Sequence, residues 1–231
     1  MPIVLPIAAS EAAPSGECDW TWLQIARRVR KECGLSGTDE SPSSVVGQTG
    51  EMLHIVNWVE SAWKAIQAQR LWDWAWEIVD LTIPSGEYLI DENCSAHRYI
   101  KDSAMLGESN MQYLPWAEFR STFPSSRITA GTPTFWTVRP DRSFAVSALV
   151  EEDTLITVER YSDAGCIGGD DDRPAMPQHL REAIVWRAVM FYAGHDEAGA
   201  LYTHAKAEFR RILAEAALDQ SPEFELGAPL A

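Results

Sequence analysis

Few residues in the sequence have the types and spacing that a metal centre requires. Glu51 and His54 form a Glu-x-x-His pair, a unit that di-iron helical bundles use twice. The pair has no second copy here, and His204 with Glu208, four residues apart, supplies no matching motif. Because residues three or four apart share a helix face, both pairs are interpreted as polar neighbours on helix surfaces. No metal site is predicted.

Two other clusters carry titratable groups. Asp170, Asp171 and Asp172 offer oxygen ligands that suit calcium, but an EF-hand loop alternates its acids and ends on a distant Glu. We therefore expect a solvated acidic loop. His195 and the two acids after it fall where two helical patterns meet, so Asp196 is expected to cap the second helix. The sequence contains no phosphate-binding glycine loop, nucleophile elbow or zinc-protease motif, and no catalytic residue or cofactor is assigned.

Three tryptophans alternate with other residues at Trp72, Trp74 and Trp76. An extended segment would place all three rings on one face, whereas a helix would spread them. We interpret the series as a helix-to-strand junction whose aromatic rings pack between a helical part and a β part. A sugar-binding platform is disfavoured, because no convergent polar side chains accompany the rings.

Composition and charge restrict the class of protein. The 231 residues are 46% hydrophobic and include ten tryptophans, which excludes a disordered chain. The net charge of −15 is concentrated in residues 1–19, 151–172 and 214–231, so the remainder is nearly neutral. Specific binding of duplex DNA, which needs clustered Lys and Arg, is not expected. Four widely spaced cysteines, no signal-peptide pattern and no long apolar run favour a soluble protein made in the cytoplasm, without a membrane partner.

Hydrophobic periodicity predicts the elements that must position these residues. Apolar residues recur at three and four positions in the segments expected to be long helices, and at alternate positions in short segments between them. The expected helices cover 20–33, with Asp19 as cap, 49–74, 116–123, with Pro115 at its first position, 177–194 and 196–217. The expected strands cover 78–83, 87–90, 95–101, 134–139, 143–148 and 154–161. Pro140 and Asp141 suit a type I turn between two of these strands.

This order predicts an α+β fold. Two N-terminal and two C-terminal helices would form a four-helix bundle, with a small antiparallel β-domain inserted between the helix pairs. The expected parts are an N-terminal arm (1–19), the N-terminal helices (20–76), the β-domain with a short helix (77–161), an acidic loop (162–176), the C-terminal helices (177–217) and a C-terminal tail (218–231).

The order and spacing of short motifs across residues 20–215 resemble the head-to-tail adaptor, or connector, proteins of tailed bacteriophages. The motifs are Arg27-Arg28, Glu32-Cys33-Gly34, Thr49-Gly50-Glu51, Ile55-Val56-Asn57-Trp58-Val59, Ala62-Trp63, Ile66-Gln67, Tyr113-Leu114-Pro115-Trp116, Phe119-Arg120, Trp136-Thr137, Ala183-Ile184-Val185, Phe191-Tyr192-Ala193 and Glu208-Phe209-Arg210-Arg211. Arg142 departs from the resemblance, which leads us to expect a glycine after Pro140 and Asp141.

The resemblance implies a non-enzymatic virion protein at the head-tail junction. Such adaptors form a ring, usually twelvefold, under the portal protein; the ring extends the channel for double-stranded DNA and provides an attachment surface for a tail or nozzle protein. It implies that Asp170, Asp171 and Asp172 are candidates to face the lumen, where acids keep passing DNA from sticking. The candidate residues for a subunit or portal interface are Arg27, Arg28, Arg30, Lys31, Phe224 and Leu226.

Two other hypotheses remain open from the residues alone. One is a monomeric cytosolic helical protein that binds a ligand or a metal between its helices. The other is an enzyme whose site carries no recognisable motif. Ring assembly predicts exposed apolar surface that a second subunit covers, whereas an enzyme predicts a concave pocket with perturbed titratable groups.

Overall fold

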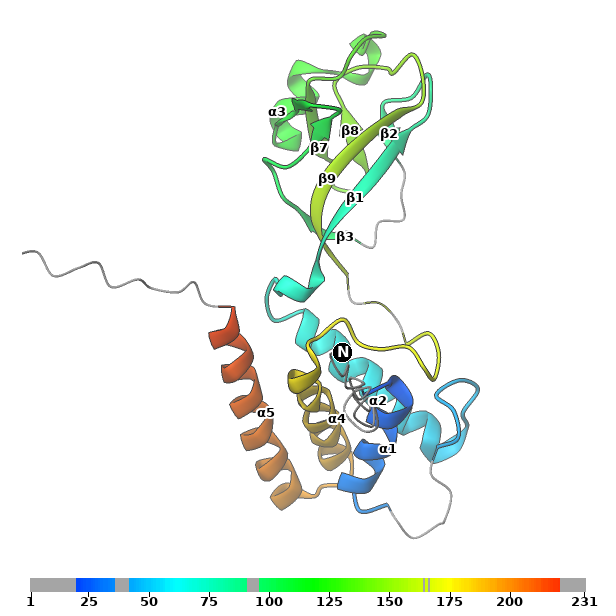
Figure 1. Ribbon diagram of the computed structural model, residues 1–231, viewed down its shortest axis with the longest axis vertical. Helices are drawn as coiled ribbons and strands as arrows, with labels where there is room; N and C mark the ends of the chain where they lie inside the picture. The colour runs from blue at the N-terminus through cyan, green and yellow to red at the C-terminus, as the bar shows by residue number, and fades with distance from the viewer. Residues whose placement is uncertain (1–19, 36–41, 91–95, 164, 166, 221–231) are drawn as a thin grey trace, which may run out of the picture. The chain divides into compact units, whose positions relative to one another are not determined.

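The computed structural model describes residues 20–35, 42–90, 96–163, 165 and 167–220 (Figure 1). Backbone contacts divide these residues into two compact units. The first unit contains the described residues of 1–62 and 167–217, and the second contains those of 63–166 and 218–220. Five α-helices and two sheets occur among the described residues, so the α+β class is confirmed.

The first unit is helical. Its helices are α1 (Trp22–Glu32), most of α2 (Gly50–Gln67), α4 (Glu182–His195), which follows the 3₁₀ turn η3 (Gln178–Leu180), and most of α5 (Gly199–Asp219). Helix α4 buries residues all round its axis, among them Ile184, Val185 and Val189. A helix that is apolar on every side must be surrounded by other elements, and α4 is therefore the centre of this unit.

Ring contacts and backbone packing identify the helices that neighbour α4. The Trp58 ring of α2 lies 5.6 Å from the Tyr192 ring, between ring centroids. On α5, His204 contacts Trp186 edge to face at 5.2 Å. Helix α1 also packs against α4. Helix α4 thus contacts all three other long helices of the described chain; the four-helix-bundle packing itself stays a prediction.

Helix α2 ends at Gln67, so the predicted extension to residue 74 is wrong. The indole N–H of Trp72 folds back and donates a hydrogen bond to the carbonyl of Ile66 at 2.8 Å. The same carbonyl accepts a hydrogen bond from the backbone N–H of Gln69 at 3.1 Å, so a side chain and the backbone together close the end of the helix. Residues Asp73–Ala75 then form the 3₁₀ turn η1. The turn stacks Trp74 on Trp72 with ring centroids 4.3 Å apart, so the rings do not share one extended face. The interpretation of this series as rings packed between a helical part and a β part stays a prediction.

The second unit contains two sheets. The first has the order β1 (Trp76–Ile83), β9 (Thr154–Ser162), β4 (Met105–Leu106) and β5 (Ser109–Asn110), and β3 (Ala96–Tyr99) also pairs with β9. The second has the order β2 (Leu89–Ile90), β8 (Phe144–Val146), β7 (Phe135–Val138) and β6 (Gln112–Tyr113). Figure 1 shows β1 and β9 as the longest pair, and their antiparallel register joins Trp76 to Tyr161 and Ile83 to Thr154.

The two sheets enclose one core. Leu81 and Ile156 from the first sheet and Trp136 and Phe144 from the second are fully buried in it. The short helix α3 (Trp116–Thr122), followed by the 3₁₀ turn η2 (Ser125–Arg127), packs next to β7. Strands β6 and β7 are parallel, which corrects the prediction of an entirely antiparallel β-domain. Strands β4, β5 and β6 were not predicted, because two residues are too few to show an alternating pattern.

Arg142 adopts a left-handed backbone conformation, with φ of 69°. The N–H of Arg142 donates to the carbonyl of Arg139 at 2.9 Å, and the N–H of Arg139 donates to the carbonyl of Ser143 at 3.0 Å. Three residues, 140–142, therefore form the loop between the hydrogen-bonded Arg139 and Ser143, in which a type I turn is followed by one left-handed residue. Glycine is the residue best suited to that position, so the backbone explains why a glycine is expected there.

Helix caps differ from the predicted ones in three places. Thr21 caps α1 in a reciprocal capping box with Gln24, while Asp19 lies outside the described residues. Pro115 occupies the N-cap position of α3 rather than the first helical position. Asp196 follows the end of α4 and does not cap α5, which begins at Gly199. The chain needs three residues, Asp196–Ala198, to turn between these helices, and Glu197 adopts a φ of 52° to make the turn.

Candidate assembly surfaces

The first sheet exposes apolar side chains on its outer face. Alternate residues of β1 and β9 point away from the core, because side chains alternate between the two faces of a sheet. Three of these outward residues are large and hydrophobic, with exposed fractions of 44% for Trp76, 57% for Ile78 and 53% for Leu155, and Met105 of the neighbouring strand β4 is 36% exposed. Met105 pairs with Thr157, which places it on the same face as Leu155. We call this surface the outer sheet face.

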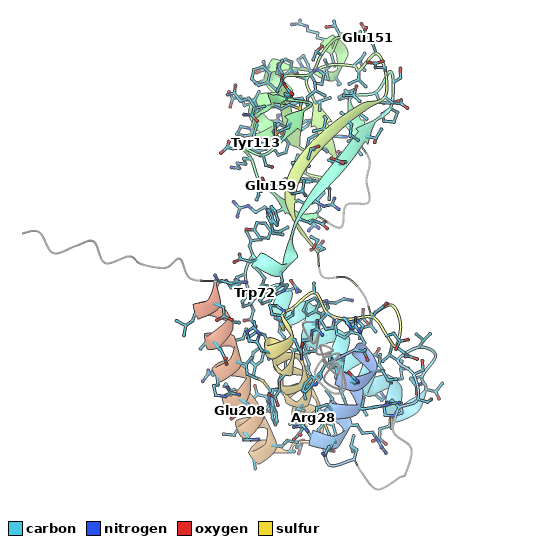
Figure 2. All side chains as sticks on the ribbon, viewed as in Figure 1. Arg28, Trp72, Tyr113, Glu151, Glu159 and Glu208 are labelled. Carbon is cyan, nitrogen blue, oxygen red and sulfur yellow. The ribbon has the colours of Figure 1, made fainter. Side chains whose placement is uncertain are left out.

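Polar contacts hold the outer sheet face in a fixed arrangement. The indole N–H of Trp76 donates to the carboxylate of Glu159 at 2.9 Å, between the paired strands β1 and β9. The hydroxyl of Thr157 donates to the carboxylate of Asp80 at 2.6 Å across the same pair. Figure 2 labels Glu159 on β9. Both carboxylates are engaged within the sheet, so the outer sheet face combines apolar side chains with polar groups that already have partners.

The opposite side of the β1–β9 pair carries an ion pair. The Nε of Arg160 lies 2.8 Å from a carboxylate oxygen of Glu77, and Arg160 itself is buried. Burial alone would lower the pKa of Arg160, but hydrogen bonds and charges from Glu77 and Tyr99 raise it above its ordinary value. Arg160 therefore stays charged and helps to fix the register of the two strands that present the outer sheet face.

The four predicted basic residues of α1 do not share one surface. Lys31 and Arg27 are exposed, and the Nε of Arg27 donates to the carbonyl of Pro42 at 2.9 Å. Arg28 forms an ion pair with Glu32 at 3.0 Å, one helical turn away. Arg30 is only 6% exposed and lies on the buried side. The structure therefore presents Arg27, Arg28 and Lys31 as the accessible cations of this helix.

The acidic loop closes the N-terminal end of α1. The first N–H groups of a helix have no partner within it. Here the N–H of Trp22 donates to the carbonyl of Asp172 at 3.0 Å, and that of Leu23 donates to the carbonyl of Asp170 at 3.5 Å. The carboxylate of Asp170 also accepts hydrogen bonds from the Ser44 hydroxyl and the Val45 N–H. Asp170 is thus a structural residue, while the Asp171 and Asp172 side chains are exposed.

The acidic residues of 151–172 are divided between the two compact units, although they are continuous in sequence. Glu151, Glu152 and Asp153 lie in the second compact unit with β9, whereas Asp170 to Asp172 lie in the first. The remaining candidates, Phe224 and Leu226, lie outside the described residues. A lumen position for the acids and an interface role for the basic and apolar candidates stay predictions.

His54 of the Glu-x-x-His pair packs among aromatic side chains. His54 stacks on Trp58 at 5.9 Å, and His195 of α4 lies 5.8 Å from the same ring. The Tyr192 ring also contacts Trp58, and burial together with a hydrogen bond to Asp196 raises the pKa of the Tyr192 hydroxyl. Across the described ranges, no three His, Cys, Asp or Glu residues come close enough together to hold a metal ion.

Cys33 lies after the last residue of α1 and is buried. Burial, followed by the negative charges of Glu32, Asp196 and Glu51, raises the pKa of its thiol to about 12. The thiol is therefore protonated at neutral pH and is a poor nucleophile. Burial and charge thus give this residue the properties of a small apolar side chain rather than of a catalytic cysteine.

Comparison with known families identifies the class of protein. Residues 20–229 match the family of the SU10 adaptor protein. The chain belongs to the SU10 adaptor protein family. A search of curated proteins found no match. The family match confirms the resemblance to bacteriophage adaptor proteins, and it includes every helix and strand of the described residues.

Members of the SU10 adaptor protein family are structural components of the bacteriophage virion. None of the helices described for this adaptor protein is both long and apolar enough to cross a membrane. The sequence did not reveal the outer sheet face of the adaptor, because β1 carries apolar residues on both faces. The adjacent pair Ile78 and Val79, of which only Ile78 is exposed, was the one available signal.

Proposed function

We propose that this chain is a head-to-tail adaptor that assembles as a ring under the portal of a tailed phage. The ring extends the channel for double-stranded DNA and provides a surface on which a tail or nozzle protein attaches. Its position is the head-tail junction of the virion, and its subunits are made in the host cytoplasm. The twelvefold stoichiometry, the four-helix bundle and the inserted β-domain at 77–161 belong to the same proposal.

The outer sheet face is the observation that carries the assembly proposal. Trp76, Ile78, Met105 and Leu155 expose apolar surface on one side of one sheet. Apolar surface that is gathered on one face marks an interaction site more often than scattered residues do. We assign a second copy of this chain as the occupant. In a ring, each copy covers this face of its neighbour with a different surface. Such a contact is heterologous, and a series of heterologous contacts can close into a ring.

The charge distribution supports a role next to DNA without specific binding. A ring multiplies the net charge of −15, and Asp171 and Asp172 expose their carboxylates to solvent. Negative charge that faces the lumen repels phosphate groups and lets the DNA pass. The exposed cations Arg27 and Lys31 of α1 are then available to acids on a neighbouring subunit or on the portal protein.

A charge placed on the outer sheet face tests the assembly proposal. Ile78→Glu is expected to prevent assembly on purified portal protein, because a buried unpaired carboxylate at an interface is strongly unfavourable. The matched control is Leu53→Glu, which changes another exposed aliphatic residue, 42% exposed, on α2. Co-sedimentation with the portal measures assembly. Loss of binding for both variants, or for neither, would contradict the assignment of this face.

A further inference from the structure

A cavity of about 390 Å³ opens in the second compact unit. Every residue that lines it belongs to residues 64–75 or 161–163. Its walls combine apolar, aromatic and cationic side chains, including Lys64, Arg70, Leu71, Trp72, Ala75 and Tyr161. The volume lies within the range of ordinary ligand pockets.

The wall of the pocket is fixed by hydrogen bonds and stacking. The Trp72 side chain is 1% exposed, and its indole N–H donates to the Ile66 carbonyl at 2.8 Å. The Ser162 hydroxyl donates to the Ala75 carbonyl at 3.1 Å, which ties the end of β9 to the turn η1. Figure 2 labels Trp72 at this turn. The pocket is therefore preformed, so a ligand would bind without ordering its walls.

The charges around the pocket favour an acidic ligand. The Arg70 guanidinium lies 5.2 Å from the centroid of the Trp72 ring, and Lys64 is exposed on the last turns of α2. The one carboxylate in the lining, that of Asp163, forms an ion pair with Arg142 at 3.1 Å. That pairing offsets its negative charge. A ligand that combines apolar side chains with carboxylates matches the two kinds of wall.

The C-terminal segment 221–231 of this chain has that composition. Glu223, Phe224, Glu225 and Leu226 alternate acidic and apolar residues. In an extended segment, the two apolar side chains lie on one side and the two carboxylates on the other. Residues Leu218–Gln220 group with the compact unit that contains the pocket. Eleven residues span up to about 36 Å when extended.

We propose that the pocket binds the segment 221–231 of the same chain. Phe224 and Leu226 enter it against Leu71, and the two glutamates face Lys64 and Arg70. The proposal goes beyond the adaptor role and is tested on the isolated protein. Its failure would leave the assembly proposal unaffected.

Hydrogen exchange on the full chain tests the contact. The unmodified protein is compared with the double variant Phe224→Asp, Leu226→Asp, whose substitutions lie outside the described fold. Exchange in the peptides that cover residues 67–76 is expected to rise about tenfold in the variant, the ratio that a contact worth about 1.4 kcal/mol produces. Equal exchange in the two proteins would overturn the proposal. Protection that grows with protein concentration would also overturn it, because the segment would then bind another copy.

A charge reversal with rescue tests the electrostatic part. Arg70→Glu is expected to raise exchange in residues 67–76, and adding Glu225→Arg is expected to restore the protection. Arg120→Glu on α3, an exposed arginine far from the pocket lining in sequence, is the matched control and should change nothing there. Circular dichroism verifies that each variant folds. If the second substitution fails to restore the protection, Glu225 does not face Arg70 and the proposed pairing is wrong.

Discussion

The carboxylate of Asp170 accepts a hydrogen bond from the hydroxyl of Ser44 at 3.0 Å, although 126 positions separate the two residues in sequence. The same oxygen accepts from the backbone N–H of Val45, whose side chain is buried. This contact fastens the acidic loop to the segment that precedes α2. Of the three consecutive acids, Asp170 therefore has a structural role, whereas Asp171 and Asp172 are exposed.

The first prediction concerns this contact. Asp170→Ala removes the acceptor of both hydrogen bonds and leaves the Val45 N–H without a partner, so we expect the free energy of unfolding to fall by about 1–3 kcal/mol. Asp171→Ala, on the exposed neighbour, is expected to change it by less than about 0.5 kcal/mol. Urea unfolding measures both. Equal effects of the two substitutions would show that Asp170 has no structural role.

The second prediction concerns the left-handed residue of the β7–β8 loop. Arg142→Gly is expected to leave the free energy of unfolding unchanged or to raise it by up to about 1 kcal/mol, because glycine adopts a φ of 69° without steric cost. Its exposed ion pair with Asp163 adds little stability. Arg142→Val is expected to lower the free energy by about 1–2 kcal/mol, since a β-branched residue is strained there. The reverse order in denaturant unfolding would contradict this account of the loop.

The third prediction concerns Cys33. Its thiol pKa is raised to about 12 in the folded protein, from an ordinary value of 9.0, chiefly by burial. The folded state therefore favours the protonated thiol. The stability that this provides is fully present below pH 9.0 and is lost as the pH rises toward 12. Cys33→Ala should remove this part of the decline in alkaline unfolding experiments.

Thiol labelling gives an independent check on Cys33. At pH 8, iodoacetamide is expected to leave Cys33 unmodified in the folded protein and to modify it in urea, because the thiolate is the reactive form. Mass spectrometry of the peptide that contains Cys33 reads the outcome. Rapid labelling of the folded protein would show that the thiol is accessible and ionised, contrary to the structure.

Local patterns predicted the long helices and the long strands, and contacts that are distant in sequence account for the errors. The apolar stripe of α2 was recognisable, but its end depends on the Trp72 indole that reaches back to Ile66. Strands of two residues, such as Met105–Leu106, carry no periodic signal and form because β9 offers them a partner. The pattern also could not show that Asp196 ends one helix instead of starting the next.

The candidate surfaces were less predictable than the fold. The motif order identified the family, and the residue types selected the acids and the basic residues of α1. Sequence could not reveal that Arg30 is buried while Lys31 is exposed, since that depends on how α1 packs against α4. The outer sheet face depends on which side of β1 meets the second sheet. That partner lies at residues 89–146, outside any local pattern.

Mass by light scattering, with and without purified portal protein, tests the central claim of ring assembly most directly. We expect the mixture to contain a particle whose mass exceeds that of the portal by a multiple of 25.8 kDa, the mass of this chain, and to show a ring in negative-stain images. A protein that stays at 25.8 kDa in the presence of the portal would contradict the adaptor ring and favour a monomeric binding protein.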